Sequence, residues 1–306
     1  MKKFWLMCIT ILTIFWSISN VLAMQTSDAK EKINISKTVD LTLTYRYDDL
    51  QFNDVSVKVY HIASIKEDFK YQLMPDFANY PIVVNGIKTQ QEWDMLEETL
   101  KSYIKADALA ESFSGAINDN EFKLNNLPVG LYLIETETID EENYTLKFDS
   151  FFVNLPSLFE NGNWNYDVQV YPKGYEYIPK YEEIKYVVVK EWQDDGKNRP
   201  DSVNIEIYKD EEKIEEKELS SSNNWTYEWI GLDDGSTWNV VERNIPDDYK
   251  VSIFKKDNTF IILNSQFGEE ENPKTGDNIN LYLYLFIGSF VSLISIIFCL
   301  LKRRKV

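Results

Sequence analysis

Short runs in which apolar residues alternate with polar ones dominate the middle of this chain, as in "LTLTYRY" (41–47) and "VSVKVYHI" (55–62). A period of two is that of a half-buried strand, and polar turn residues such as "DDLQFND" (48–54) separate the runs. Further runs of this kind are "FKLNNL", "GLYLIETET", "YTLKF", "SFFVNL" and "YDVQVYP". Short strands at this spacing predict an all-β fold built from antiparallel sandwiches.

One segment breaks this pattern. Residues 89–112, "TQQEWDMLEETLKSYIKADALAES", place apolar side chains at steps of three and four, which predicts an amphipathic helix. Thr89 and Glu92 have the spacing of a capping box at its start. We expect this helix to lie against the first sandwich and to cover its core.

The two ends of the chain have the composition of targeting segments. Residues 1–23 combine Lys2 and Lys3 with an apolar stretch and a small-residue exit at Ala23, which predicts a cleaved secretory signal; an uncleaved membrane anchor is the alternative. Residues 281–301 carry no charge and are long enough to span a bilayer, and the basic tail 302–306 follows. Both ends predict that the residues between them are extracellular.

These patterns divide the rest of the chain into five segments. We predict a leader at 24–34, a first sandwich at 35–173 that contains the helix, a linker at 174–181, a second sandwich at 182–267 and a sorting segment at 268–306. Seven strand patterns in the second sandwich indicate an immunoglobulin-like fold. One of them, "EEKIEEKE", is so charged that we expect it at an exposed sheet edge.

Charge and composition exclude several functions. The net charge is −18, which argues against nucleic acid and anionic lipid as partners. The two cysteines, Cys8 and Cys299, fall in the signal and the apolar span, so no disulfide is expected in the exported part. The single histidine, His61, is more readily packed than catalytic. Both "DDG" sequences, 194–196 and 233–235, are more typical of turns than of calcium sites, so we expect no bound metal. We also expect no cofactor, and a protein that is not an enzyme.

The second sandwich resembles a known family. "VVVKEWQDDGKNRPDSVNIEIYKD", "NNWTYEWIGLD", "WNVVERNIPDDY" and "FIILN" follow in the order of the Cna protein B-type domain of Gram-positive surface proteins. The resemblance implies that a lysine on the first strand and an asparagine on the last are joined covalently, with help from a buried acid. The matching residues are Lys190, Asn264 and Glu242.

The physical chemistry of these three residues agrees with such a bond. Lys190 shares a strand face with Val188 and Trp192, and Asn264 also lies among apolar residues. Burial lowers the pKa of a lysine and raises that of a glutamate, so a neutral amine could attack while a protonated acid polarises the amide carbonyl and passes protons to the leaving ammonia. The alternative is an ion pair between Lys190 and Glu242, with Asn264 as a hydrogen-bonded turn residue.

The first sandwich resembles the N-terminal domain of sortase-assembled pilins. "WNYDVQVYPK" fits the pilin motif at Trp164, Val168, Val170, Tyr171, Pro172 and Lys173, although Gly174 stands where asparagine is common. The resemblance implies that Lys173 is the nucleophile that joins one subunit to the next; an ordinary surface lysine is the alternative. "LYLIETET" resembles the E-box, with Glu135 as its acid. Arg46 stands where a lysine would start a second cross-link, although Lys37 and Lys58 remain possible partners of Glu135.

The sequence "NPKTG", Asn272, Pro273, Lys274, Thr275 and Gly276, lies just before the apolar span and resembles a cell-wall sorting motif of the L-P-x-T-G type. The resemblance implies that sortase cuts after Thr275 and links the protein to peptidoglycan or to another pilin subunit. We therefore expect a structural, wall-anchored pilus subunit. The alternatives are a minor or basal pilin, or a stand-alone adhesin for a host or matrix ligand; a surface hydrolase or ligand sensor is disfavoured by the lone histidine.

Overall fold

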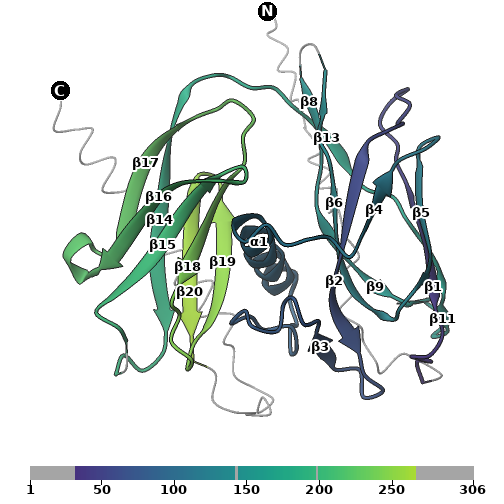
Figure 1. The fold of residues 1–306 in the computed structure, drawn as a ribbon, viewed down its shortest axis with the longest axis horizontal. Helices are drawn as coiled ribbons and strands as arrows, with labels where there is room; N and C mark the ends of the chain where they lie inside the picture. The colour runs from purple at the N-terminus through teal and green to yellow at the C-terminus, as the bar shows by residue number, and fades with distance from the viewer. Residues whose placement is uncertain (1–31, 142–143, 198, 267–306) are drawn as a thin grey trace, which may run out of the picture. The chain divides into compact units, whose positions relative to one another are not determined.

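The structure is a computed structural model, and it describes residues 32–141, 144–197 and 199–266 (Figure 1). The signal 1–23, most of the leader 24–34, the motif 272–276, the apolar span 281–301 and the basic tail lie outside these residues. The described part consists mostly of β-strands in several sheets, with one α-helix, as the sequence predicted. That helix is not long and apolar enough to cross a membrane.

Residues 33–177 form what we call the N-terminal sheets. A three-stranded sheet has the order β12-β1-β5, with β1 (Val39–Thr44) parallel to β12 (Asp167–Val170) and antiparallel to β5 (Glu121–Leu127). A five-stranded sheet contains β3 (Tyr71–Leu73), β2 (Ser56–Ile65), β6 (Gly130–Thr136) and β9 (Phe151–Leu155) in that order, with β4 (Phe113–Ala116) also paired to β2. The remaining strands are β7 (Ile139–Asp140), β8 (Thr145–Phe148), β10 (Ser157–Leu158), β11 (Trp164–Asn165) and β13 (Gly174–Tyr177).

The five-stranded sheet is buried on both faces. Its residues Val57, Tyr132 and Leu155 pack with Leu41 and Leu43 of β1 in one core. The other face has a second core against the helix. It is formed by Tyr60, Ile62, Leu131, Leu133, Phe152, Trp93, Leu96, Leu100 and Ile104, with further residues. Because alternate side chains of a strand point to opposite faces, one strand can serve both cores, and burial of these apolar surfaces stabilises the three layers.

The helix is α1 (Gln90–Ala106), and its capping box is present as predicted. The Thr89 side chain accepts from the Glu92 backbone N–H at 3.2 Å, and Glu92 accepts from the Thr89 N–H at 2.9 Å. The predicted end at residue 112 is wrong, because the helix ends at Ala106. Ala108 has a φ of 47°, and the Leu109 N–H turns back to the Ile104 carbonyl at 3.0 Å, a left-handed closing turn that apolar spacing does not reveal.

Residues 183–265 form the C-terminal sheets, and all seven predicted strands are present. One sheet has the order β17-β14-β20-β19 and contains β14 (Glu183–Gln193), β17 (Thr226–Leu232), β19 (Lys250–Lys256) and β20 (Thr259–Ser265). The other has the order β16-β15-β18 and contains β15 (Ser202–Lys209), β16 (Glu212–Ser220) and β18 (Trp238–Arg243). The charged strand β16 lies at a sheet edge, as expected. The first strand, β14, is parallel to the last, β20.

The predicted linker 174–181 is partly a strand. Its first four residues are β13, which pairs with β8 so that Gly174 lies opposite Phe148 and Tyr177 opposite Thr145. A Cβ at Gly174 would come within 3.0 Å of the Phe148 ring, so a small residue permits this close pairing. The chain therefore leaves the N-terminal sheets later than its sequence suggested.

The lone histidine is a packed residue, as expected. The His61 ring stacks on Tyr132, with ring centroids 4.4 Å apart, and burial lowers its pKa. Among the residues that the structure describes, no group of three or more His, Cys, Asp or Glu side chains could hold a metal ion.

Candidate cross-linking site

Lys190, Asn264 and Glu242 come from three different strands and meet in the interior of the C-terminal sheets. Lys190 lies on β14 and Asn264 on the neighbouring strand β20, two residues beyond the partner of Lys190 in the parallel register. Glu242 lies on β18 of the other sheet. The exposed fractions of Lys190, Glu242 and Asn264 are 3%, 1% and 0%. The sequence prediction that these three polar residues are buried among apolar neighbours is confirmed.

The three side chains are in direct contact. The Asn264 Nδ2 donates to Glu242 Oε1 at 2.7 Å, and the Lys190 Nζ lies 3.6 Å from Glu242 Oε2. The carboxyl group therefore contacts both the amine and the amide. Sequence reasoning expected the acid to polarise the amide carbonyl, but the amide nitrogen faces Glu242 here. Asn264 Oδ1 has no hydrogen-bond partner among the described residues.

Lys190 has further partners around its amine. The Nζ donates to the Glu191 carbonyl at 2.7 Å and to the Ile262 carbonyl at 3.4 Å, and lies 4.0 Å from the centre of the Trp192 ring. The strand partners next to these groups, Val188 on β14 and Ile205 opposite Glu242, belong to the core of the C-terminal sheets. These contacts orient the amine, yet they replace only part of the hydration that a charged ammonium has in water.

Burial shifts the pKa values of Lys190 and Glu242 in the directions that favour the uncharged form of each group. Burial lowers the pKa of Lys190 to about 8, against the opposing attraction of Glu242. Burial raises the pKa of Glu242, although Lys190 and the hydrogen bond from Asn264 oppose this. Loss of water penalises both charged forms, so burial lowers the cost of passing a proton from the amine to the carboxylate. The site can thus present a neutral amine beside a protonated acid.

The pilin-motif residues lie in and next to β11 and β12 of the N-terminal sheets. Trp164 is in β11 and stacks on Phe69 at 5.9 Å, whereas Val168 and Pro172 are buried. Tyr171 is exposed, and the Cζ of Arg46 lies 5.0 Å from the centre of its ring. Lys173 is exposed between β12 and β13, and its carbonyl accepts from the Asp149 N–H at 3.3 Å. The motif thus joins β12, in which Val168 is buried, to an accessible lysine.

The E-box acid is not part of a similar buried group. Glu135 is half-buried near the end of β6, with the exposed Lys58 opposite it on β2. It lines a cavity of about 890 Å³ together with Lys101 and Lys105 of α1. Arg46 is exposed, and so is Lys37, whose amine lies 4.0 Å from the Tyr166 ring centre. The arrangement found around Glu242 is therefore not repeated at Glu135.

Sequence reasoning missed one neighbour of the site. The Tyr103 hydroxyl, on α1, donates to the backbone carbonyl of Glu242 at 3.2 Å. Tyr103 belongs to the apolar stripe of the helix, and a hydroxyl within such a stripe was the available signal. The stripe alone does not tell which of two surfaces each residue faces.

Residues 186–265 match the family model of the Cna protein B-type domain. This part of the chain is a Cna B-type domain, and the match includes Lys190, Glu242 and Asn264. The comparison with curated proteins gave no match.

Several solved structures are similar at low identity. A B repeat unit of the collagen-binding surface protein Cna of Staphylococcus aureus is 15% identical, with 78% of this chain and 100% of that chain covered and a TM-score of 0.26. The shaft pilin SpaA of Lactobacillus rhamnosus is 17% identical, with 76% and 100% covered and a TM-score of 0.28. A minor pilin of Streptococcus agalactiae is 15% identical, with 78% and 100% covered and a TM-score of 0.24.

Proposed function

We propose that the chain is a structural subunit of a Gram-positive cell surface whose Cna B-type domain cross-links itself through Lys190 and Asn264. One observation carries this proposal: an amine, a carboxyl group and an amide, all buried, are in contact across the two C-terminal sheets. A buried ion pair adds little to the stability of a fold, because removing both charges from water costs several kcal/mol and offsets their attraction. Conversion to an amide removes both charges.

The reaction balances without any added reagent. Lys190 first gives a proton to the Glu242 carboxylate, and its Nζ then attacks Cγ of Asn264. Glu242 donates a proton to Nδ2 across the 2.7 Å contact and takes one from the attacking nitrogen. The Nζ–Cγ bond forms, the Cγ–Nδ2 bond breaks, and one ammonia leaves. The reaction occurs once per molecule, so the chain is not an enzyme in turnover.

Intact mass measurement tests the cross-link. We expect the mass of the purified chain to be lower than that of its sequence by one ammonia, after allowance for removal of the signal. Peptide mapping should find the Lys190 peptide joined to the Asn264 peptide. The variant Glu242→Gln should retain the ammonia because it cannot carry the proton. An unaltered mass in the wild-type chain would contradict the proposal.

We further propose that sortase joins the chain to neighbouring subunits through Lys173 and to the wall or another subunit through Thr275. The support is an exposed lysine at the end of a complete pilin motif and the motif "NPKTG" before an apolar span. In this scheme Thr275 is the acyl donor and Lys173 the acceptor. The partners are sortase, peptidoglycan and other pilin subunits, at the cell wall. A minor or basal pilin, or an adhesin for a host or matrix ligand, uses only Thr275.

An immunoblot of muramidase-released wall material separates these functions. For a shaft subunit, we expect a high-mass ladder in wild type that disappears in Lys173→Ala. The matched control is Lys180→Ala, another exposed lysine seven positions on, which should keep the ladder. A ladder that persists in Lys173→Ala would exclude the shaft function and favour the minor pilin or the adhesin.

A further inference from the structure

The strands that carry the candidate cross-linking site, together with their neighbour β19, include two sheet edges. β18, which carries Glu242, ends the order β16-β15-β18, and β19, the neighbour of the Asn264 strand, ends the order β17-β14-β20-β19. An edge strand leaves alternate N–H and C=O groups without a partner in its own sheet. Here α1 packs against both edges, and Figure 1 shows it beside β19.

On β19, groups from the N-terminal part of the chain meet two successive outward N–H groups. The Ile253 N–H donates to Thr99 Oγ1 at 2.7 Å, and the Val251 N–H donates to the Pro81 carbonyl at 2.7 Å. The Thr99 hydroxyl in turn donates to the Met95 carbonyl at 2.6 Å, which fixes its lone pairs toward β19. Thr99 is 1% exposed, so water does not substitute for this bond.

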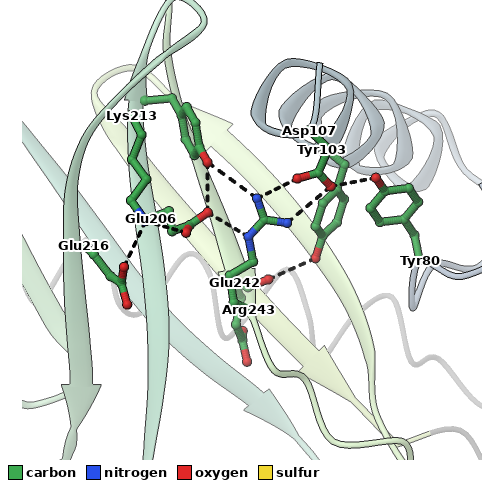
Figure 2. Close-up of polar contacts among 9 residues, drawn as sticks. Tyr80, Tyr103, Asp107, Glu206, Lys213, Glu216, Glu242 and Arg243 are labelled. Atoms are coloured by element: carbon green, nitrogen blue, oxygen red, sulfur yellow. Dashed lines mark hydrogen bonds and ion pairs between the residues drawn. The ribbon is translucent and has the colours of Figure 1, made fainter. Parts of the chain in front are cut away.

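On β18, the contacts are made by the last turns of α1 (Figure 2). The Tyr103 hydroxyl donates to the Glu242 carbonyl, and Tyr103 packs within the core of the C-terminal sheets. One residue on, Arg243 donates to both oxygens of Asp107, at 2.7 and 3.2 Å. Asp107 caps the helix and also accepts from Tyr80 at 2.6 Å. The helix is therefore held to β18 at two adjacent residues.

These anchor points lie beside the reacting residues in the strand register. Val251 is opposite Asn264, and Ile253 is opposite Ile262, which is in turn opposite Lys190. Glu242 itself accepts from Tyr103. One rigid helix is thus fixed both to the sheet that holds Asn264 and to the sheet that holds Glu242, at the level where these residues touch. Its position sets the separation of the two sheets there, and displacement of about 1 Å can slow a reaction by about a hundredfold.

We propose that α1 positions Glu242 against Asn264 for the cross-linking reaction, with Thr99 and Tyr103 as the positioning residues. This inference rests on the proposed cross-link. It implies an order of events: the N-terminal sheets and α1 fold, the C-terminal sheets dock on the helix, and the covalent bond then forms. The N-terminal part of the chain thereby acts as an assembly template for the domain that follows it.

The test measures how fast the bond forms in the full-length chain. Protein is made in a short cell-free pulse, and intact mass follows the loss of ammonia with time. Thr99→Val keeps the shape of the side chain but cannot accept from Ile253, whereas Thr99→Ser keeps the hydroxyl. Tyr103→Phe removes only the bond to Glu242. Val203→Ala, a core residue on β15 with no polar contact to the helix, controls for a general loss of stability.

We expect cross-linking to be roughly tenfold to a hundredfold slower in Thr99→Val and Tyr103→Phe, and at wild-type rate in Thr99→Ser and Val203→Ala. The rescue by serine would show that the hydroxyl, and not the fold in general, sets the rate. Wild-type rates in Thr99→Val and Tyr103→Phe would overturn the positioning role but not the proposed cross-link. The same holds if Thr99→Ser or Val203→Ala slows the reaction as much as Thr99→Val does. If the wild-type chain never loses ammonia, the proposed function fails and this inference fails with it.

Discussion

At the scale of residues, the unusual feature is a pair of ionisable groups that are buried away from solvent. Lys190 and Glu242 are almost completely buried, and each loses the hydration that stabilises its charge. The pKa shifts of both groups follow from this loss. The same desolvation that makes an ion pair costly favours the neutral amine, which is the nucleophilic form, and the protonated carboxyl, which has a proton to donate.

Replacement of Lys190 by methionine tests what the bond contributes to stability. Lys190→Met keeps the length of the side chain, removes the nucleophile and should leave the chain without the cross-link. Because the bond closes the loop from 190 to 264, its loss should lower the free energy of unfolding by about 4 kcal/mol on a chain-entropy estimate. Urea or guanidinium unfolding measures this difference.

The matched control is Lys185→Met on the same strand. Lys185 is half-exposed in an ion pair with Glu228, so its replacement should change stability by less than about 1 kcal/mol. Equal stability of Lys190→Met and wild type would mean that no such bond contributes.

At the scale of elements, a polar network joins α1 to strands of the three-stranded C-terminal sheet. Arg243 on β18 contacts Asp107 at the end of α1 and, at 2.7 Å, Glu206 on β15. Glu206 also accepts from Lys213 on β16 at 2.6 Å, as Figure 2 shows. Burial by itself would raise the pKa of Glu206, but its bonds to Lys213, Arg243 and Tyr208 outweigh burial and lower the pKa to about 2.

This network predicts sensitivity to acid. The folded-state pKa of Glu206 lies below the unfolded value of about 4.3, so its contribution is present above pH 4.3 and is lost as the pH falls toward 2. Glu206→Gln should be less stable than wild type at pH 7 by about 1 kcal/mol, since solvent screens Lys213 and Arg243, and the difference should vanish near pH 2. Urea unfolding at a series of pH values measures it. Glu228→Gln, on the exposed face of β17, is the control; the same pH dependence in both variants would contradict the role of Glu206.

Most elements were predictable because their signals are local. Strands such as β15 and β17 alternate in burial, and the charges of "EEKIEEKE" identified an edge. The capping box of α1 was read correctly from Thr89 and Glu92. The helix end was not, since it depends on the left-handed backbone of Ala108. The strand β13 was missed because its pairing with β8 comes from distant residues, and "GYEY" has no strong strand pattern of its own.

At the scale of the whole molecule, α1 is the part that sequence reasoning placed incompletely. It covers the N-terminal five-stranded sheet, as expected, through Trp93, Leu96 and Leu100. It also contributes Tyr103 to the core of the C-terminal sheets, which the pattern could not indicate. An apolar stripe predicts that a helix is buried but not how many partners bury it. The candidate site itself was predictable because the family resemblance named all three of its residues.

The parallel pairing of β14 and β20 leads to a mechanical prediction. With force applied between residue 173 and the C-terminal end, a cross-linked molecule should not release the segment between Lys190 and Asn264. Lys190→Met should release it and extend by about 250 Å more, from the length of an extended chain. Single-molecule force spectroscopy gives this difference directly, and the same extension in both proteins would contradict the cross-link.

The position of Lys173 also decides which part of each subunit would bear tension in a fibre. Lys173 follows β12 and precedes β13, so the strands from β1 to β12 all come before it in the chain. If neighbours are attached at Lys173 and Thr275, the line of force enters at Lys173, crosses from Lys190 to Asn264 and leaves through the C-terminal segment. Residues 32–172 then form a side branch of this line rather than a link in it. A fibre built in this way would not be broken or extended by the length of residues 32–172 even where that side branch unfolds.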